Sequence, residues 1–423
     1  MTLSEQDLNY IWHPYTHQKN RVPAIPILKG TGSLLVDENG NEYIDATSSW
    51  WVNIHGHAHP YIARKLYEQA LKLEHVIFTG FTHEPAIRLA SRLLEILPAN
   101  FSKIFYSDNG STATEVAIKM ALQYWKNHGR NKSKIIAFNA SYHGDTFGAM
   151  SISNRSLFNA AFEDKLFEVL FIDPPTANNI EQITNALSPH HDIACFIYEP
   201  LLQGAGGMLM HNAALMNELL AFLKSKEIIC IADEVLTGFY RTGTLFASEQ
   251  IEIKPDIICL SKGLTGGTMA LGVTAATSHI FEAFISDDKT NTFYHGHSFT
   301  ANPLACTAAN ASLDLLEHND CIQNISMIKK SQEEFIDSLA KSVTRLSTKN
   351  HRVCGTIAAF EIVTEGADSY LNNLGPVFTE YCIRNGVYLR PLGNTVYIMP
   401  PYCITDAELT TIYGVIISFL NQV

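Results

Sequence analysis

The chain has 423 residues, of which 46% are hydrophobic and 17% charged, so it can bury a large core and form more than one domain. Its formal net charge is −12, and its Lys and Arg residues are scattered without a basic patch, which argues against nucleic-acid binding. It contains no run of about 18 apolar residues and no basic start followed by an apolar core, so we expect neither a membrane span nor a signal peptide. The eight cysteines form no Cys-x-x-Cys pair, and several lie in apolar runs, which favours reduced thiols in a cytoplasmic protein.

The first 60 residues combine an aromatic arm with a predicted hairpin. Residues 10–17 are aromatic and irregular, and packing against the body is the ordinary role for such an arm. The turn at 37–40, which ends in Asn-Gly, predicts a hairpin between two short strands. Trp50 and Trp51 are adjacent and cannot both face one core, so we expect one of them to line a pocket. Three histidines alternate over 55–59, but no Cys or carboxylate completes a ligand set, so no metal site is predicted.

A possible anion site follows the next helices. Residues 61–97 have helical periodicity, and a strand at 103–106 runs into Gly110, Ser111 and a long amphipathic helix. Small residues at a helix start leave backbone N–H groups free, and the helix dipole favours an anion there. An ordinary N-cap is the alternative interpretation of the same residues.

Two further strands end in loops of different character. The strand at 134–138 leads to Tyr142 and His143, which supply a ring able to stack on a planar cofactor. The strand at 193–198 leads to the Gly-rich loop 203–207. That loop does not match the Gly-x-Gly-x-x-Gly pattern and precedes no dinucleotide-type helix, so we discount a nicotinamide site.

The strands at 228–232 and 256–260 each end at a charged residue. Asp233 follows the first strand, and Lys262 follows the second, 29 residues later. Ligands of open α/β sheets bind at the carboxyl ends of the strands, where a partly desolvated lysine becomes an amine nucleophile. A surface lysine is the ordinary alternative, but the nearby acid argues against it. Pyridoxal phosphate requires this pair, because the lysine bonds to the cofactor while the acid holds its pyridine nitrogen protonated.

The five strands alternate with helical stretches, which predicts an α/β fold with a mostly parallel central sheet and helices on both faces. Helices at 305–316 and 321–346, with strands near 355–363, 387–390 and 396–399, indicate a smaller α+β domain. We therefore expect three parts. These are an N-terminal arm and small-domain segment (1–60), a large cofactor-binding domain (61–310) and a C-terminal small domain (311–423).

The chain resembles the class III aminotransferases, which are pyridoxal-phosphate enzymes of fold type I. The resemblance runs from about residue 11 to about residue 403, and it rests on residues 12–16, 48–51, 142–151, 203–208, 390–391 and 399–402. Within the family these motifs are similar to those of members that transfer the α-amino group of S-adenosylmethionine to 8-amino-7-oxononanoate in biotin biosynthesis. The resemblance also implies a cytoplasmic homodimer with active sites at the subunit interface.

The resemblance assigns roles to particular residues. It makes Lys262 and Asp233 catalytic. The implied cofactor-binding residues are Gly110, Ser111, Tyr142, Asp233, Val235 and Lys262, with His297 and Ser298 reaching across from the partner subunit. The implied substrate-binding residues are Tyr15, Trp50, Tyr142, Arg241, Lys262, Gly296 and Arg390. Many family members have Pro-Thr where this chain has His297-Ser298; the serine keeps the hydroxyl group.

Two other functions are compatible with parts of this pattern. Another class III transaminase, acting on an ω-amino acid or a lysine donor, would share Lys262 and Asp233 but has no special need for the N-terminal aromatic residues. A non-catalytic pyridoxal-phosphate-binding protein is the more remote alternative. Mere binding does not require a lysine that serves both as cofactor anchor and as proton carrier.

Overall fold

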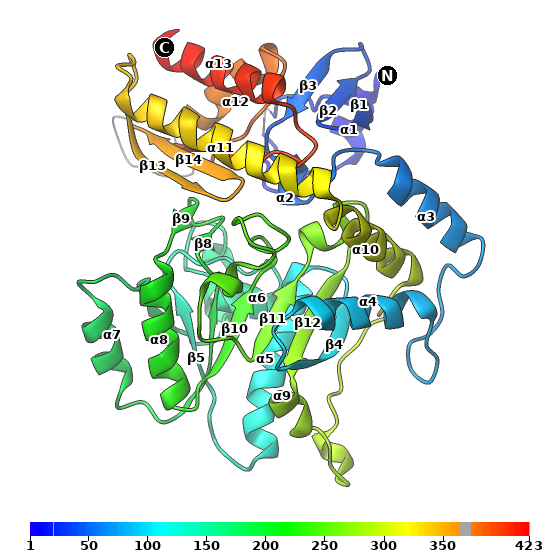
Figure 1. Ribbon diagram of the computed structural model, residues 1–423, viewed down its shortest axis with the longest axis vertical. Coiled ribbons are helices and arrows are strands. Elements are labelled where there is room, and N and C mark those ends of the chain that lie inside the picture. Colours follow the sequence, from blue (N-terminus) through cyan, green and yellow to red (C-terminus); the bar gives the residue numbers. More distant parts are fainter. Residues whose placement is uncertain (20, 364–373, 423) are drawn as a thin grey trace.

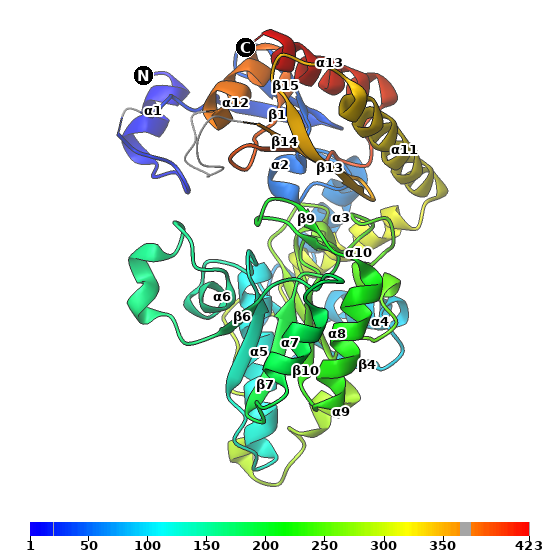
Figure 2. The ribbon, with the colours of Figure 1, turned by 90° about the vertical axis from the view of Figure 1, so that its left-hand side faces the viewer.

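The computed structural model describes residues 1–19, 21–363 and 374–422. A lower body surrounds a large central sheet, and an upper body contains two smaller sheets, both chain ends and the three C-terminal helices (Figures 1 and 2). The active-site residues predicted from the strand ends belong to the lower body.

The central sheet has seven strands. Their spatial order is β4 (Phe101–Ser107), β12 (Gly272–Thr277), β11 (Ile257–Leu260), β10 (Ile229–Asp233), β7 (Ile193–Tyr198), β5 (Lys134–Phe138) and β6 (Leu170–Ile172). Strand β12 runs in the opposite direction to the other six strands, which confirms the predicted mostly parallel α/β sheet. Strands β6 and β12 were not predicted. The first has only three residues, and the second consists mainly of small residues without a strong apolar run.

Both faces of this sheet are covered, because successive strand residues enter different apolar clusters. In β10, Ile229 and Ile231 pack with the buried face of α5, whereas Cys230 and Ala232 pack into the larger cluster on the opposite face. This alternation is the geometry of a strand buried on both sides. The helices of the lower body are α3 (Pro60–Ala70), α4 (Glu84–Ile96), α5 (Gly110–Asn127), α6 (Phe147–Ile152), α7 (Ile180–Leu187), α8 (Ala213–Ser225), α9 (Ser278–Glu282) and α10 (Pro303–Leu316).

The upper body joins the two ends of the chain. Strand β3 pairs in parallel with β15, so residues more than 340 positions apart share one sheet. One sheet has the order β1 (Ile27–Thr31), β2 (Leu34–Asp37), β3 (Glu42–Asp45) and β15 (Val387–Tyr388); the other has β13 (Thr348–Cys354), β14 (Ile357–Ile362) and β16 (Thr395–Ile398). The remaining elements are α1 (Leu3–Tyr10), α2 (Ser48–Trp51), β8 (Leu202–Gln203), β9 (Leu209–Met210), α11 (Asn319–Lys341), α12 (Leu374–Arg384) and α13 (Asp406–Gln422). The antiparallel pairing of β2 with β3 confirms the predicted hairpin.

Two further features concern the cysteines and the length of the apolar helices. All eight cysteines are free thiols. Across residues 1–19, 21–363 and 374–422, no helix combines the length and the apolar character that crossing a membrane requires.

Candidate active site

The carboxyl ends of β10 and β11 open into a cavity of about 400 Å³. Asp233 is the last residue of β10, and Lys262 lies two residues beyond β11. Because β10 and β11 pair in parallel, the two side chains enter the same cavity, as the strand-end argument predicts. Its volume lies within the range of small-molecule sites. The walls include Trp51, Gly110, Ser111, Tyr142, His143, Glu199, Asp233, Val235, Leu236 and Lys262.

Lys262 has the character of an amine nucleophile. Burial lowers the pKa of its amine from 10.5 to about 8, even though the charges of Asp233 and Glu199 act in the opposite direction. Its Nζ atom lies 4.5 Å from the centre of the Trp51 ring. The backbone of Lys262 has a positive φ of 43°, which directs the chain into a 3-10 turn, Lys262–Thr265.

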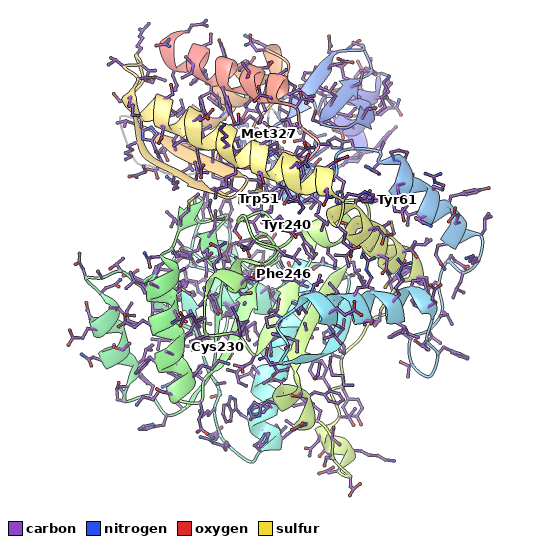
Figure 3. All side chains as sticks on the ribbon, in the orientation of Figure 1. Trp51, Tyr61, Cys230, Tyr240, Phe246 and Met327 are labelled. Carbon is purple, nitrogen blue, oxygen red and sulfur yellow. The ribbon has the colours of Figure 1, made fainter. Side chains whose placement is uncertain are left out.

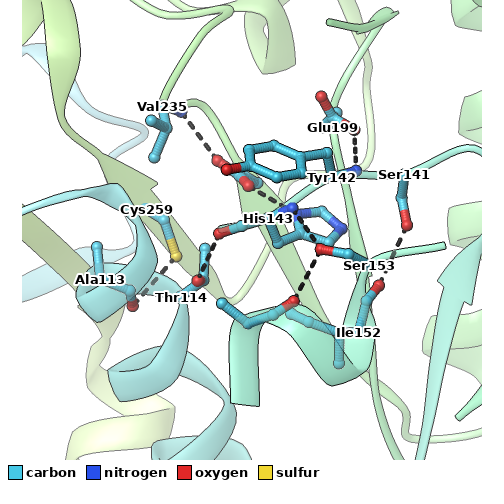
Figure 4. A network of polar contacts seen from close by, with 12 residues as sticks. Ala113, Thr114, Ser141, Tyr142, His143, Ile152, Ser153, Glu199, Val235 and Cys259 are labelled. Atoms are coloured by element: carbon cyan, nitrogen blue, oxygen red, sulfur yellow. Dashed lines mark hydrogen bonds and ion pairs between the residues drawn. The ribbon is translucent and has the colours of Figure 1, made fainter. Parts of the chain in front are cut away.

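A buried histidine supports Asp233. The Nδ1 atom of His143 lies 2.6 Å from Oδ2 of Asp233, and the backbone N–H of Val235 donates to Oδ1 at 3.0 Å (Figure 4). The backbone N–H of His143 donates to Ser153 Oγ at 2.9 Å, which fixes the loop that carries the ring. The sequence marked His143 only as a ring beside Tyr142, and its contact with Asp233 required the tertiary structure.

The start of α5 forms an anion cradle. The first N–H groups of a helix have no partner within the helix. Asn109 satisfies one of them, because its side-chain oxygen accepts from the backbone N–H of Thr112 at 2.9 Å. The first regular helical bond then runs from the N–H of Ala113 to the backbone oxygen of Asn109 at 3.0 Å. Gly110 and Ser111 lie on the cavity wall, with N–H groups for which the helix supplies no acceptor. This arrangement suits a phosphate group.

Close packing explains why Gly110 is a glycine. A Cβ atom at this position would lie 2.8 Å from Val235 Cγ1. Val235 itself lines the cavity next to Asp233. A larger residue at 110 would therefore displace Val235, which forms part of the cavity wall.

Glu199 is a buried acid that the sequence analysis did not select. Its Oε2 accepts from the backbone N–H of Tyr142 at 3.2 Å (Figure 4). Its Oε1 accepts from the backbone N–H of Gly204 at 2.9 Å. Burial raises the pKa of Glu199 to about 7, and Asp233 acts in the same direction. Glu199 thus ties the Tyr142 loop to the Gly-rich loop directly at the cavity wall. The Glu-Pro that follows a predicted strand was the available signal.

A second cavity of about 590 Å³ lies on the other side of the tryptophan pair. It is mostly apolar, and Trp50 and Arg390 are part of its lining. The indole N–H of Trp51 donates to the hydroxyl of Tyr397 at 3.0 Å, which connects the wall of the first cavity to the wall of the second. The remaining lining comes from 22–25, Ile27, Leu35, Tyr43, Thr47, Ser49, Ile383, Tyr388, Pro391, Leu392 and Tyr397.

Tyr15 links the N-terminal arm to this region. Its hydroxyl donates to Asp145 Oδ2 at 2.5 Å and lies 3.5 Å from the Tyr142 hydroxyl. Its ring stands edge-on to Trp50, with 5.5 Å between ring centres. Tyr15, Trp50 and Tyr142, which the sequence named separately, therefore lie together. Asp145 was not among the predicted site residues.

Arg241 lines neither cavity, although its charge helps to lower the pKa of Lys262. The side chain is buried, and Nη1 donates to the backbone oxygen of Pro400 at 2.8 Å. Its guanidinium lies 5.0 Å from the centre of the Tyr402 ring. Nε and Nη2 have no hydrogen-bond partner among the described residues.

Gly296, His297 and Ser298 also line neither cavity of their own chain. They lie in a loop between the 3-10 turn Lys289–Asn291 and α10, and the N–H of His297 donates to Thr300 Oγ1 at 3.0 Å. Within one chain, the structure therefore does not bring this predicted part of the site to Lys262.

Two of the three alternating histidines have separate hydrogen-bond partners, whereas Nδ1 of His59 has none among the described residues. His55 Nε2 lies 3.0 Å from Ser312 Oγ, and His57 Nε2 lies 2.9 Å from Asp45 Oδ2. In the described part of the chain, no group of three or more His, Cys, Asp or Glu residues could hold a metal ion.

A family model described as aminotransferase class-III matches residues 15–420, and the chain belongs to this family.

The chain is also similar to individual members of this family. The chain is 45% identical to the adenosylmethionine-8-amino-7-oxononanoate aminotransferase of Synechococcus elongatus, over 98% of this chain and 99% of the relative. It is 39% identical to the protein of the same description from Geobacter sulfurreducens, over 96% and 95%. The crystal structure of such an enzyme from Methanocaldococcus jannaschii covers 99% of this chain and 98% of its own, with 34% identity and a TM-score of 0.94. An omega transaminase from Pseudomonas jessenii in complex with PMP is 25% identical, covers 98% of this chain and 96% of its own, and has a TM-score of 0.91.

Proposed function

We propose that this aminotransferase binds pyridoxal phosphate and transfers the α-amino group of S-adenosylmethionine to 8-amino-7-oxononanoate, which gives 7,8-diaminononanoate for biotin biosynthesis. The observation that carries the proposal is the convergence of Lys262, Asp233 and the start of α5 on one cavity. The relatives at 45% and 39% identity support the choice of substrates.

The residues of the first cavity fit the cofactor. Gly110 and Ser111 would hold its phosphate, Tyr142 and Val235 would lie against the two faces of its ring, and Asp233 would keep its pyridine nitrogen protonated. When bound, the cofactor supplies an electron sink for the bonds at the substrate's amine-bearing carbon.

Lys262 has two tasks in this proposal. Its amine would hold the resting cofactor, and once free it would carry a proton to and from the substrate carbon. A pKa of about 8 suits both tasks near neutral pH, because the neutral and the protonated amine are then both well populated. His143 would orient Asp233 for this role through the contact between its Nδ1 atom and Oδ2.

The aromatic residues suit both substrates. Trp50, Tyr15 and Tyr142 offer ring faces that attract a sulfonium cation and pack against a methylene chain. Arg390, in the apolar second cavity, would bind the carboxylate of the keto acid. Arg241 is the proposed second carboxylate contact on the resemblance alone, since its buried side chain lines neither cavity.

A homodimer is part of the proposal. Gly296, His297 and Ser298 would complete the phosphate and substrate sites of the partner subunit. The loop is flanked by Tyr294 and Phe299, which are 74% and 63% exposed, and exposed aromatic side chains are typical of interfaces. We further propose a cytoplasmic enzyme with the domain division 1–60, 61–310 and 311–423.

A donor screen tests the function. Purified protein with added cofactor should absorb in the visible range, and S-adenosylmethionine should convert that absorbance to the pyridoxamine form, whereas lysine, ornithine and β-alanine should not. Lys262→Ala protein serves as the control and should show no conversion. Conversion by lysine alone would make the donor assignment wrong, and conversion by β-alanine would favour the ω-amino-acid alternative. Protein that stays colourless with added cofactor would contradict the cofactor assignment.

A further inference from the structure

The segment Ser48–Trp51 is a strained turn. It has helix-like backbone hydrogen bonds, from Trp51 N–H to Thr47 O at 3.1 Å and from Val52 N–H to Ser48 O at 3.0 Å. Three of its four residues nevertheless have positive φ angles, namely Ser48 (52°), Ser49 (60°) and Trp51 (69°). None is glycine, so this conformation persists only if its surroundings impose it.

Asp45, the last residue of β3, supplies the restraint. The carboxylate is fully buried, with Oδ2 accepting from the backbone N–H of Ser49 at 2.6 Å and Oδ1 accepting from that of Thr47 at 3.1 Å. The Nε2 atom of His57 lies 2.9 Å from the same Oδ2.

The second ring nitrogen of His57 defines the direction of that contact. Its Nδ1 atom lies 2.7 Å from Nδ2 of Asn53, which can only donate, so Nδ1 accepts. The ring proton is then on Nε2 and points to Asp45. Asp45 therefore receives three donors at 2.6–3.1 Å: the backbone N–H of Ser49 in the turn, that of Thr47 just before it, and the ring of His57, which Asn53 orients. The hydroxyl groups of Thr47 and Ser49 add two longer contacts at 3.4 Å.

This turn sends the two tryptophans in opposite directions. Trp51 is 4% exposed, lies against Lys262 and appears at the junction between the two bodies (Figure 3). Trp50 is 48% exposed, lies against Tyr15 and lines the second cavity. An ordinary helical turn would not separate neighbouring side chains in this way, because consecutive residues lie only about 100° apart around its axis.

We infer that Asp45, oriented by His57, is a positioning residue for the aminotransferase reaction. By holding the Ser48–Trp51 turn in its strained form, it keeps Trp51 against the reactive amine and Trp50 against the second cavity. Asp45 itself lines neither cavity, so it acts through the tryptophans. The kinetic part of this inference rests on the proposed function, whereas the placement of the tryptophans does not.

The first test uses cofactor-free protein. The chain has four tryptophans, so a Trp12→Phe, Trp125→Phe background leaves Trp50 and Trp51 as the reporters. Asp45→Asn should shift their emission to the red and raise acrylamide quenching at least about twofold, because the amide cannot accept from all three donors. His57→Ala should change the emission in the same direction, and it replaces Asp45→Asn if that variant does not fold.

Asp256→Asn is the matched control. This carboxylate also accepts a backbone N–H, from Cys230 at 2.8 Å, and pairs with Lys224, but it lines neither cavity. It should lower the melting temperature without changing the emission. Equal emission changes in both variants would mean that Asp45 has only a general structural role.

The second test is a double-mutant cycle on the first half-reaction. Asp45→Asn alone should slow the half-reaction about tenfold but change it less than twofold in a Trp51→Phe background, because the residue through which it acts is already altered. Ser49→Gly should restore part of the loss, since glycine adopts a positive φ without strain. The inference would be overturned if Asp45→Asn slowed the half-reaction by the same factor with and without Trp51→Phe, and if Ser49→Gly restored none of the lost rate. If no half-reaction with S-adenosylmethionine occurs, the proposed function fails while the emission test still decides the placement.

Discussion

The side-chain nitrogen of Lys262 lies 4.5 Å from the centre of the Trp51 ring. The indole therefore covers one side of the amine and keeps water from it, and Tyr397 holds the indole at its N–H. A ring face attracts a cation, whereas the loss of water favours the neutral amine. Burial is the larger effect, because the pKa of Lys262 falls to about 8.

The first prediction concerns the pH dependence of this amine. With a pKa of about 8, half of the Lys262 amine is neutral at pH 8, compared with about 0.3% for a lysine at 10.5. The initial rate of pyridoxal phosphate attachment to cofactor-free protein should therefore rise through a midpoint near pH 8. Lys262→Ala protein gives the background from other lysines. A midpoint above pH 10 would contradict the prediction.

The second prediction concerns Glu199 and stability. Its pKa is raised from 4.5 to about 7, so the folded state holds this proton more tightly than the unfolded state does. Its contribution to the free energy of unfolding is therefore lost as the pH rises from about 4.5 to 7. Glu199→Gln cannot ionise, so its unfolding free energy relative to the parent should increase by about 1–3 kcal/mol between pH 5 and 7.5.

Denaturant unfolding of the cofactor-free protein at the two pH values measures this change. Glu38→Gln, at an exposed position, should show no comparable pH dependence. A difference between Glu199→Gln and the parent that stays constant with pH would show that Glu199 is ionised throughout this range.

The third prediction concerns the phosphate cradle. Gly110→Ala places a Cβ atom 2.8 Å from Val235 Cγ1 and forces one of the two to move. Overpacking of this kind costs about 1–3 kcal/mol, so cofactor affinity should fall about 10- to 100-fold. Titration of cofactor-free protein with pyridoxal phosphate measures the affinity. Gly414→Ala in α13, with no atom within 4 Å of the new Cβ, is the control and should leave affinity unchanged.

The fourth prediction concerns the N-terminal arm. Tyr15→Phe removes the hydroxyl that donates to Asp145 and loosens the ring beside Trp50. A hydrogen bond to a charged group contributes about 1.5–3 kcal/mol, and partial solvent access reduces that value. We therefore expect the KM for 8-amino-7-oxononanoate to rise about tenfold with a smaller change in kcat. Steady-state kinetics test this, with Tyr10→Phe as the control because Tyr10 is exposed on the same arm. A large loss of kcat at unchanged KM would assign Tyr15 to the chemical step instead.

The sequence alone predicted five of the seven strands of the central sheet and the pair of charged residues at its edge. Apolar runs that stop at Asp233 and Lys262 predict buried parallel strands, and the carboxyl ends of such strands meet at one edge. The start of α5 was predicted equally well, because Asn109, Gly110 and Ser111 are small residues of the kind that begin a helix. These features depend on neighbours in the chain, so local patterns predict them.

The tertiary structure alone decided which tryptophan meets Lys262. Both neighbouring residues have the same side chain, and their directions follow from the strained turn that Asp45 holds. The buried acid Glu199 and the contact of His143 with Asp233 likewise join loops that lie far apart in the sequence. Such contacts depend on the three-dimensional packing of distant segments, for which no local hydrophobic pattern carries information.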